Sequence, residues 1–140
     1  MKKIKVLFVC IHNSARSQMA EAFLNELGAG KFEAESAGLE PGQLNPIVIE
    51  VMKEVDMDIS NNTTNSVFDF YKADKKYDYV ITVCDEASGE RCPVFLGISG
   101  RLHWGFTDPS SLKAENKLRQ TREIRDEIKA KILEFINQCH

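Results

Sequence analysis

Apolar residues in this 140-residue chain fall into two kinds of pattern that alternate along its length. Short segments rich in apolar residues, such as 4–9 and 77–83, indicate buried strands, and stripes with a spacing of three or four residues indicate helices. The predicted elements, in chain order, are a strand at about 3–9, a helix at 16–27, a strand at 32–36, a helix that begins at Asn45-Pro46, a short helix at 67–71, a strand at 77–83, a short strand near His103-Trp104 and a long helix at 113–137. Alternating strands and helices predict a parallel, doubly wound sheet. We expect a single α/β domain over 1–140, with a four-stranded sheet and helices on both faces.

Two of the predicted helices carry additional signals. Asn45-Pro46 places a capping side chain before a proline at the first helical position, which marks a helix start. In the C-terminal helix the apolar residues recur every three or four positions and predict one buried face; they are Ile124, Ile128, Ile132 and Phe135. The charged face of that helix, which includes Glu123, Arg125 and Lys129, is interpreted as solvated.

Charge and apolar segments argue against two classes of protein. The net charge is −3 and the basic residues are dispersed, so we expect no nucleic-acid partner. No apolar segment approaches the roughly 20 residues that cross a bilayer, and we expect no membrane association. The apolar run after Met1-Lys2-Lys3 ends at Cys10 without the cleavage site of a signal peptide. We therefore expect a cytoplasmic protein. We also expect a monomer.

The chain has four cysteines, Cys10, Cys84, Cys92 and Cys139. A chain of this length with a good core needs no disulfide framework. No CxxC pair or His/Cys cluster has the spacing of a zinc site, so we predict no metal of that kind. In a reducing compartment the remaining options are buried inert thiols or redox chemistry. Cys139, beside the terminal His140, is interpreted as frayed and incidental.

The segment from Cys10 to Ser17 carries the strongest chemical signal, because it connects a predicted strand to a predicted helix. At such a junction several backbone N–H groups point into one small space, and the helix dipole adds partial positive charge. This environment favours the thiolate of Cys10, and the guanidinium of Arg16 can bind two oxygens of a tetrahedral anion. The candidate oxyanion-binding residues are Ile11, His12, Asn13, Ser14, Ala15, Arg16 and Ser17.

Simpler interpretations of this segment remain open at this point. Cys10 can be a buried thiol that ends the strand, with Arg16 on a solvated first helical turn. His12 invites assignment as a base or a metal ligand. Since a thiolate activated by a helix terminus needs no base, we interpret His12 as a loop residue.

A second cysteine follows another predicted strand. Because the carboxyl ends of parallel strands meet at one edge of a sheet, Cys84 and Cys10 are expected to face the same crevice. Cys92 lies eight residues beyond Cys84. A continuous helix would hold their Cα atoms roughly 12 Å apart, beyond the roughly 4.4–6.8 Å of a disulfide. A Cys84–Cys92 bond therefore requires looped or unwound backbone, for which Gly89 and Pro93 offer a mechanism; the alternative is two unrelated thiols.

Thr107-Asp108-Pro109 is the third chemical signal. An aspartate before proline favours extended or turn geometry and is often only a loop-forming device. Alternatively, Asp108 lies over the anion loop and acts as a general acid that protonates a leaving oxygen. The neighbouring His103-Trp104-Gly105-Phe106 is interpreted as packing that positions this loop.

Taken together, these motifs resemble the thioredoxin-coupled arsenate reductases, which share the fold and the anion loop of the low-molecular-weight protein tyrosine phosphatases. The resemblance covers essentially the whole chain. It rests on an ordered series of motifs: Cys10-x5-Arg16-Ser17-Gln18-Met19-Ala20-Glu21, Ser36-Ala37-Gly38, Asp58-Ile59-Ser60, Val83-Cys84, Cys92-Pro93 and His103-Trp104-Gly105-Phe106-Thr107-Asp108-Pro109.

The resemblance implies reduction of arsenate to arsenite by a relay of three cysteines. In the family pattern, Cys10 attacks arsenate and Asp108 assists loss of the leaving oxygen. Cys84 then attacks the Cys10–arsenic adduct and releases arsenite, and Cys92 resolves the resulting disulfide by an ordinary thiolate displacement. Reduced thioredoxin is the expected electron donor, with glutaredoxin as the alternative and no tightly bound cofactor. Phosphate and sulfate are expected to compete with arsenate.

Two features depart from the family pattern. Seven residues separate Cys84 from Cys92, one more than is usual in the family. Some members bind potassium through residues that resemble Asn13, Glu21 and Ser36, together with an aspartate where this chain has Asn65. The loss of that carboxylate weakens the expectation of a bound cation.

Two other functions are compatible with the same loop. A low-molecular-weight protein tyrosine phosphatase or another phosphomonoesterase would use Cys10, Arg16 and Asp108 identically and ignore the other thiols. The phosphatases that the chain resembles generally carry a second cysteine where Ala15 stands and a proline where Gln18 stands. A non-enzymatic anion-sensing domain is disfavoured because nucleophile and acid are both present.

Overall fold

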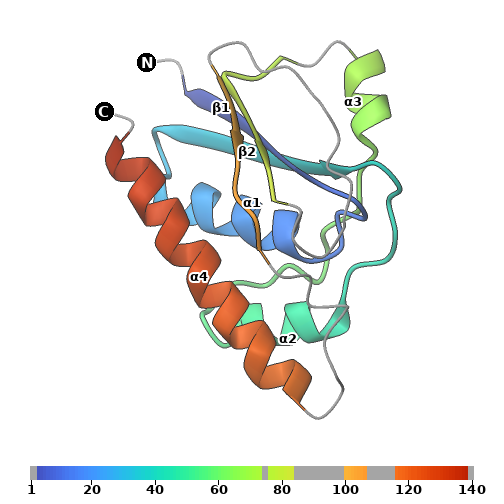
Figure 1. Ribbon diagram of the computed structural model, residues 1–140, viewed down its shortest axis with the longest axis vertical. Helices are drawn as coiled ribbons and strands as arrows, with labels where there is room; N and C mark the ends of the chain where they lie inside the picture. The colour runs from blue at the N-terminus through green and yellow to red at the C-terminus, as the bar shows by residue number, and fades with distance from the viewer. Residues whose placement is uncertain (1–2, 74–75, 84–99, 107–115, 139–140) are drawn as a thin grey trace.

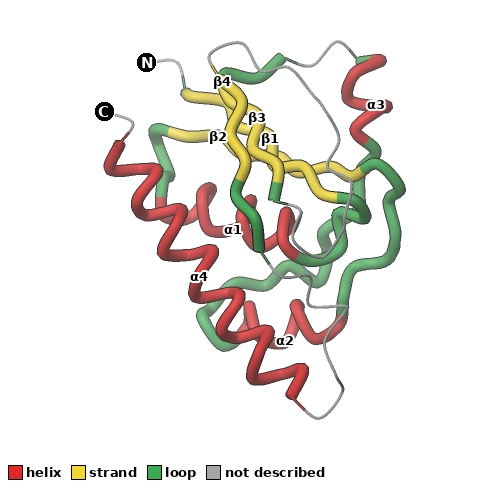
Figure 2. Tube along the Cα trace, viewed as in Figure 1, coloured by secondary structure: helices red, strands yellow, loops and turns green. Residues whose placement is uncertain are grey.

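The protein forms a four-stranded parallel sheet in the computed structural model, which describes residues 3–73, 76–83, 100–106 and 116–138. The strand order is β2-β1-β3-β4, with β1 at Ile4–Cys10, β2 at Phe32–Gly38, β3 at Tyr79–Thr82 and β4 at Gly100–His103. Helices α1 and α4 cover one face of the sheet, and α3 lies toward the other (Figures 1 and 2). The predicted fold class is therefore confirmed.

The four helices of the described residues are α1 (Arg16–Leu27), α2 (Pro46–Lys53), α3 (Val67–Lys72) and α4 (Lys117–Gln138). Every predicted helix and strand is present, and the ends differ by a few residues. At the start of α2, the side-chain oxygen of Asn45 accepts the N–H of Ile47 at 2.9 Å, as the Asn-Pro pair predicted. In the described part of the chain, no helix is long and apolar enough to cross a membrane.

Strand β1 lies inside the sheet and is buried on both faces. Its residues Val6, Leu7, Phe8 and Val9 have no exposed surface. Val6 and Phe8 pack in the core beneath α1 and α4, whereas Leu7 and Val9 pack in a second cluster with Val67 of α3. Because a shift of one residue would exchange the two sets of side chains, this packing fixes the register of β1 and hence the position of Cys10 at its end.

The segment after β4 is held by aromatic packing. The ring of Trp104 lies 5.9 Å from that of Phe8 and 5.6 Å from that of Phe135 on α4. Trp104 and Phe106 are both 8% exposed, which confirms for these two residues the prediction that segment 103–106 mainly packs. His103 is exposed, and its Nδ1 lies 2.6 Å from the hydroxyl of Thr82. These contacts hold the segment from His103 to Phe106 against the sheet and α4.

Strand β2 lies at an edge of the sheet, and a side chain of α1 covers part of that edge. Asn25 donates its amide N–H to the carbonyl of Ala34 at 3.1 Å and accepts the N–H of Ala34 at 2.8 Å. This side chain therefore occupies the place of a further strand, and protects β2 from pairing with another chain.

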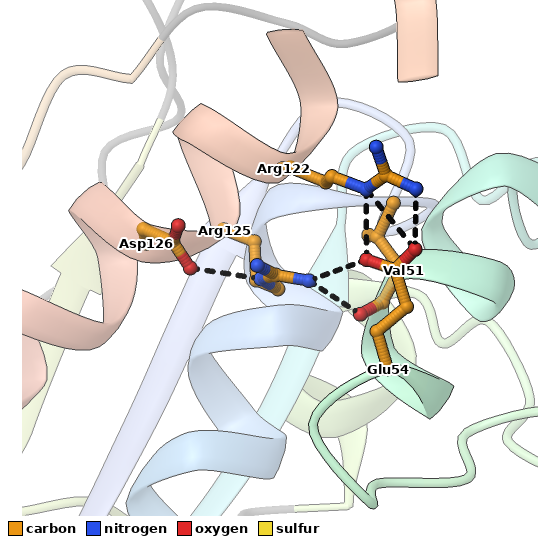
Figure 3. A network of polar contacts seen from close by, with 5 residues as sticks. All are labelled: Val51, Glu54, Arg122, Arg125 and Asp126. Carbon is orange, nitrogen blue, oxygen red and sulfur yellow. Dashed lines mark hydrogen bonds and ion pairs between the residues drawn. The ribbon is translucent and has the colours of Figure 1, made fainter. Parts of the chain in front are cut away.

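The interpretation of the charged face of α4 as solvated is wrong for Arg125. Its guanidinium is buried against α2, where NH1 donates to the carbonyl of Val51 and to Glu54, both at 2.9 Å (Figure 3). Arg122 binds the same carboxylate through two nitrogens, and Asp126 pairs with Arg125. The hydrogen bond from Arg122, supplemented by that from Arg125, lowers the pKa of Glu54. These contacts fasten α4 to α2, a pairing that helical periodicity does not reveal.

Candidate active site

Cys10 is the last residue of β1, at the edge of the sheet where the parallel strands end. The chain leaves β1 for β2 on one side and later returns to β3 on the other, so this edge is a topological switch point, the usual ligand crevice of such sheets. The loop 11–15 then leads into α1 at Arg16. The residue before α1 is Ala15, whose side chain cannot cap the first N–H groups of the helix, so these groups can bind an anion.

The segment 39–45 sets the orientation of the loop's peptide groups. Its N–H groups donate to loop carbonyls in four pairs: Leu39 to Cys10, Glu40 to Ile11, Gly42 to His12 and Asn45 to Ser14, at 2.8–3.2 Å. In a trans peptide the carbonyl and the following N–H point in opposite directions. The N–H groups of residues 11, 12, 13 and 15 are therefore directed away from segment 39–45. Successive N–H groups on one side of a loop form an anion-binding concavity.

Gly38 allows the loop to pass close to the end of β2. A Cβ at this position would lie 2.7 Å from the carbonyl oxygen of Ile11 and 2.9 Å from the backbone nitrogen of Asn13. Both are backbone atoms, so they cannot move aside as a flexible side chain can. Only glycine is compatible with this approach.

Two hydrogen-bond donors reach the sulfur of Cys10. The backbone N–H of Asn13 donates to Sγ at 3.0 Å, and the hydroxyl of Ser17 lies 3.0 Å from Sγ. Asn13 Nδ2 donates to that hydroxyl at 2.8 Å, since Asn13 Oδ1 is turned toward the N–H of Asn65. The Ser17 oxygen is thus an acceptor, and its proton is left to donate to Cys10. Two donors therefore converge on the Cys10 sulfur at the start of the anion loop.

Arg16 is buried, which contradicts the interpretation of a solvated first helical turn. It is 3% exposed, and its NH1 donates to the carbonyl of Phe106 at 3.1 Å. This bond connects the anion loop to the residue that precedes Thr107-Asp108-Pro109. The guanidinium of Arg16 therefore places a positive charge beside the loop 11–15, whose N–H groups point away from segment 39–45.

The other predicted site residues divide into two groups. His12 is exposed, and its Nδ1 lies 3.0 Å from the carbonyl oxygen of Glu40, a contact that suits a loop residue. Cys84, Cys92, Asp108 and Cys139 lie outside the described residues. The chain just before Cys84 is placed, since the N–H of Val83 donates to the carbonyl of Val9 at 2.9 Å.

The four residues considered for potassium do come together, but their oxygens already accept protein hydrogens. Ser36 Oγ donates to Glu21 at 3.1 Å, and Asn65 donates through Nδ2 to the Ser36 carbonyl at 3.1 Å and through its backbone N–H to Asn13 Oδ1 at 2.8 Å. Burial raises the pKa of Glu21 to about 7, despite the hydrogen bond from Ser36. Asn65 thus presents N–H donors to this cluster where the family pattern has a carboxylate.

Sequence reasoning missed three contributors to the site. Segment 39–45 acts through backbone N–H groups, for which side-chain identity gives no signal. Gly38 was noted only as part of a motif, and its close contact depends on the loop that passes it. Gln18 was noted only within the motif and as a proline position in the phosphatases, and it is 1% exposed beneath the loop.

Comparisons with known proteins agree with this geometry. The model of the low molecular weight phosphotyrosine protein phosphatase family matches residues 5–140. An arsenate reductase of Staphylococcus saprophyticus is 41% identical over 96% of this chain and 98% of its own. A solved arsenate reductase in the phosphate-binding state has a TM-score of 0.79 and is 35% identical, over 98% of this chain and 99% of that one.

A thioredoxin-dependent arsenate reductase of Corynebacterium glutamicum also shares the fold. Its TM-score is 0.72 at 30% identity, over 99% of this chain and 64% of that chain. These matches extend over the sheet, the anion loop and the helices described above. The relatives named above are arsenate reductases, and the chain belongs to the low molecular weight phosphotyrosine protein phosphatase family.

Proposed function

We propose that this protein reduces arsenate to arsenite, with Cys10 as the nucleophile and Arg16 and the loop N–H groups as the oxyanion site. The observation that carries the proposal is the pair of hydrogen bonds from Asn13 and Ser17 to the Cys10 sulfur, at the mouth of a loop built for an anion. Arsenate, phosphate and sulfate are tetrahedral oxyanions of this kind, so phosphate and sulfate compete for the site. The similarity to a phosphate-bound arsenate reductase supports this choice.

The first chemical step forms the Cys10–arsenic bond. The thiolate of Cys10 attacks As(V), and one arsenate oxygen leaves after Asp108 protonates it, so that water is lost. Arg16 and the loop N–H groups neutralise the oxygens that remain on arsenic. This step changes no oxidation state.

The second step carries the reduction. Cys84 attacks the sulfur of Cys10, a Cys10–Cys84 disulfide forms, and the electron pair of the sulfur–arsenic bond remains on arsenic, which leaves as As(III) arsenite. The placement of Val83 beside Val9 supports this role, because Cys84 is the next residue along the chain. Cys92 then attacks Cys84, which frees Cys10 and leaves a Cys84–Cys92 disulfide. Reduced thioredoxin supplies two electrons to that disulfide.

The experiment that tests this function measures arsenite formation with thioredoxin, thioredoxin reductase and NADPH. We expect sustained NADPH oxidation that depends on arsenate, and no turnover by Cys10→Ser, although this variant still binds phosphate. Replacement of thioredoxin by glutaredoxin and glutathione identifies the reductant. Absence of arsenite from the wild-type protein in both systems would contradict the proposal.

A phosphatase would use the same loop, so the second thiol distinguishes the two reactions. Cys84→Ser should abolish multiple turnover of arsenate and leave slow hydrolysis of an aryl phosphate largely intact. Rapid hydrolysis of aryl phosphates without arsenate reduction would favour the phosphatase.

A further inference from the structure

We propose that Gln18 is a positioning residue that controls the reactivity of Cys10 by holding Asn13 in the conformation that donates to sulfur. Gln18 lies in the first turn of α1 and is 1% exposed. It does not reach Cys10 or the anion side of the loop through any of its described hydrogen bonds. Its effect therefore passes through Asn13.

The side-chain amide of Gln18 has one favourable orientation. Its Nε2 faces three oxygens: Asn13 O at 3.1 Å, Asn13 Oδ1 at 3.3 Å and Thr63 O at 3.0 Å. Its Oε1 accepts from Asn62 Nδ2 at 3.1 Å. A reversed amide would place oxygen against three acceptors and nitrogen against a donor. The network therefore fixes Nε2 toward Asn13.

Asn13 has a left-handed backbone, with φ at 55°. Asparagine adopts this conformation more readily than other residues with a Cβ, and the surrounding hydrogen bonds hold it there. Gln18 and the N–H of Asn65 hold the carbonyl and side-chain oxygens of Asn13, which keeps the residue in this conformation and directs Nδ2 to Ser17. The backbone N–H of Asn13, whose peptide group is also held by the bond from Gly42 to the His12 carbonyl, donates to Cys10. Gln18 thus acts on the Cys10 sulfur by supporting the backbone conformation of Asn13 and by keeping Asn13 Nδ2 on Ser17.

The contacts predict a separation between two measurable properties. Gln18 binds the carbonyl and the side-chain oxygen of Asn13, whereas segment 39–45 orients the loop N–H groups that face the anion. Loss of the Gln18 hydrogen bonds should slow reactions of Cys10 much more than it weakens phosphate binding. A merely structural role would weaken both together.

The test measures alkylation of Cys10 by iodoacetamide as a function of pH, read from the Cys10 peptide by mass spectrometry. Gln18→Met keeps the size of the side chain and removes its donors, and we expect alkylation about tenfold slower near neutral pH. We expect phosphate protection against alkylation to change by no more than about twofold. In turnover, kcat should fall more than KM rises.

A second variant adds a response to pH. Gln18→Glu places a carboxylate against the oxygens of Asn13, so near neutral pH it should be slower than Gln18→Met. At acid pH the protonated carboxyl can donate one hydrogen bond, and the rate relative to wild type should recover. Asn62→Ala at an exposed position frees the Gln18 amide without changing the core, and should slow alkylation about two- to threefold.

Asn25→Ala is the matched control, because Asn25 is also an α1 amide that bonds neighbouring backbone, away from the loop. It should lower the unfolding midpoint and leave the alkylation profile unchanged. An unchanged profile in Gln18→Met and Asn62→Ala, an equal change in Asn25→Ala, or an equal loss of phosphate binding would overturn the inference. The inference rests on Cys10 being the nucleophile, but alkylation needs no arsenate, so its failure is distinct from failure of the proposed reaction.

Discussion

The close contact between Gly38 and the anion loop predicts a large effect from a single methyl group. In Gly38→Ala the new Cβ would lie 2.7 Å from the Ile11 carbonyl oxygen and 2.9 Å from the Asn13 nitrogen. Ordinary contacts are longer, so the loop must retreat by roughly 0.5–1 Å. A displacement of about 1 Å at a reacting centre costs on the order of 100-fold in rate. We expect kcat/KM for arsenate to fall about 10- to 100-fold.

The same overpacking should destabilise the fold by about 1–3 kcal/mol, which corresponds to roughly 3–9 °C in the unfolding midpoint. Calorimetric titration with phosphate and the coupled arsenate assay measure the effect on the site. Gly42→Ala is the matched control, because its Cβ would meet His12 Cβ at 3.7 Å, an ordinary contact. If Gly38→Ala binds phosphate and turns over arsenate within about twofold of Gly42→Ala, the account of the loop is refuted.

Two further predictions concern stability. Glu21 has a pKa of about 7 in the folded protein against 4.5 for an ordinary glutamate, so between these values the folded protein holds more protons than the unfolded chain, and stability falls as pH rises. Glu21→Gln should remove this pH-dependent part of the free energy of unfolding. In urea denaturation, the stability of the variant relative to wild type should therefore rise from about pH 5 to about pH 8. A difference in stability that stays constant with pH would contradict the raised pKa of the buried carboxyl. Arg125→Met should lower stability by about 1–3 kcal/mol because it leaves the Val51 carbonyl without its donor, and Arg122→Met, at an exposed position, should have a smaller effect. Equal effects of the two arginine variants would show that burial of Arg125 is unimportant.

Local patterns were sufficient to predict the order of elements and the place of the nucleophile. Residues 6–9 form an uninterrupted apolar run because β1 is buried on both faces, and the run ends at Cys10, where the crevice begins. The Asn45-Pro46 start of α2 depends only on neighbouring residues. Such features are encoded within a few positions of the chain, and sequence reasoning found them.

Features that depend on distant segments were not predictable in the same way. Arg125 lies in a charged stretch of α4, and only its contact with α2 shows that it is buried. The loop is oriented by backbone N–H groups about 30 residues away, which any residue except proline supplies. Gln18 follows two other polar residues, Arg16 and Ser17, so polarity does not single it out, and its role depends on its contacts with the Asn62–Thr63 segment.

The most direct test of the proposed reaction uses Cys92→Ser in a single exposure to arsenate without thioredoxin. We expect about one equivalent of arsenite, after which the protein stalls as a Cys10–Cys84 disulfide that peptide mass spectrometry identifies. Addition of thioredoxin and its reductase should not restore the rate of the wild-type protein. Recovery of Cys10 joined to Cys139, or sustained thioredoxin-driven turnover without Cys92, would contradict the assigned relay.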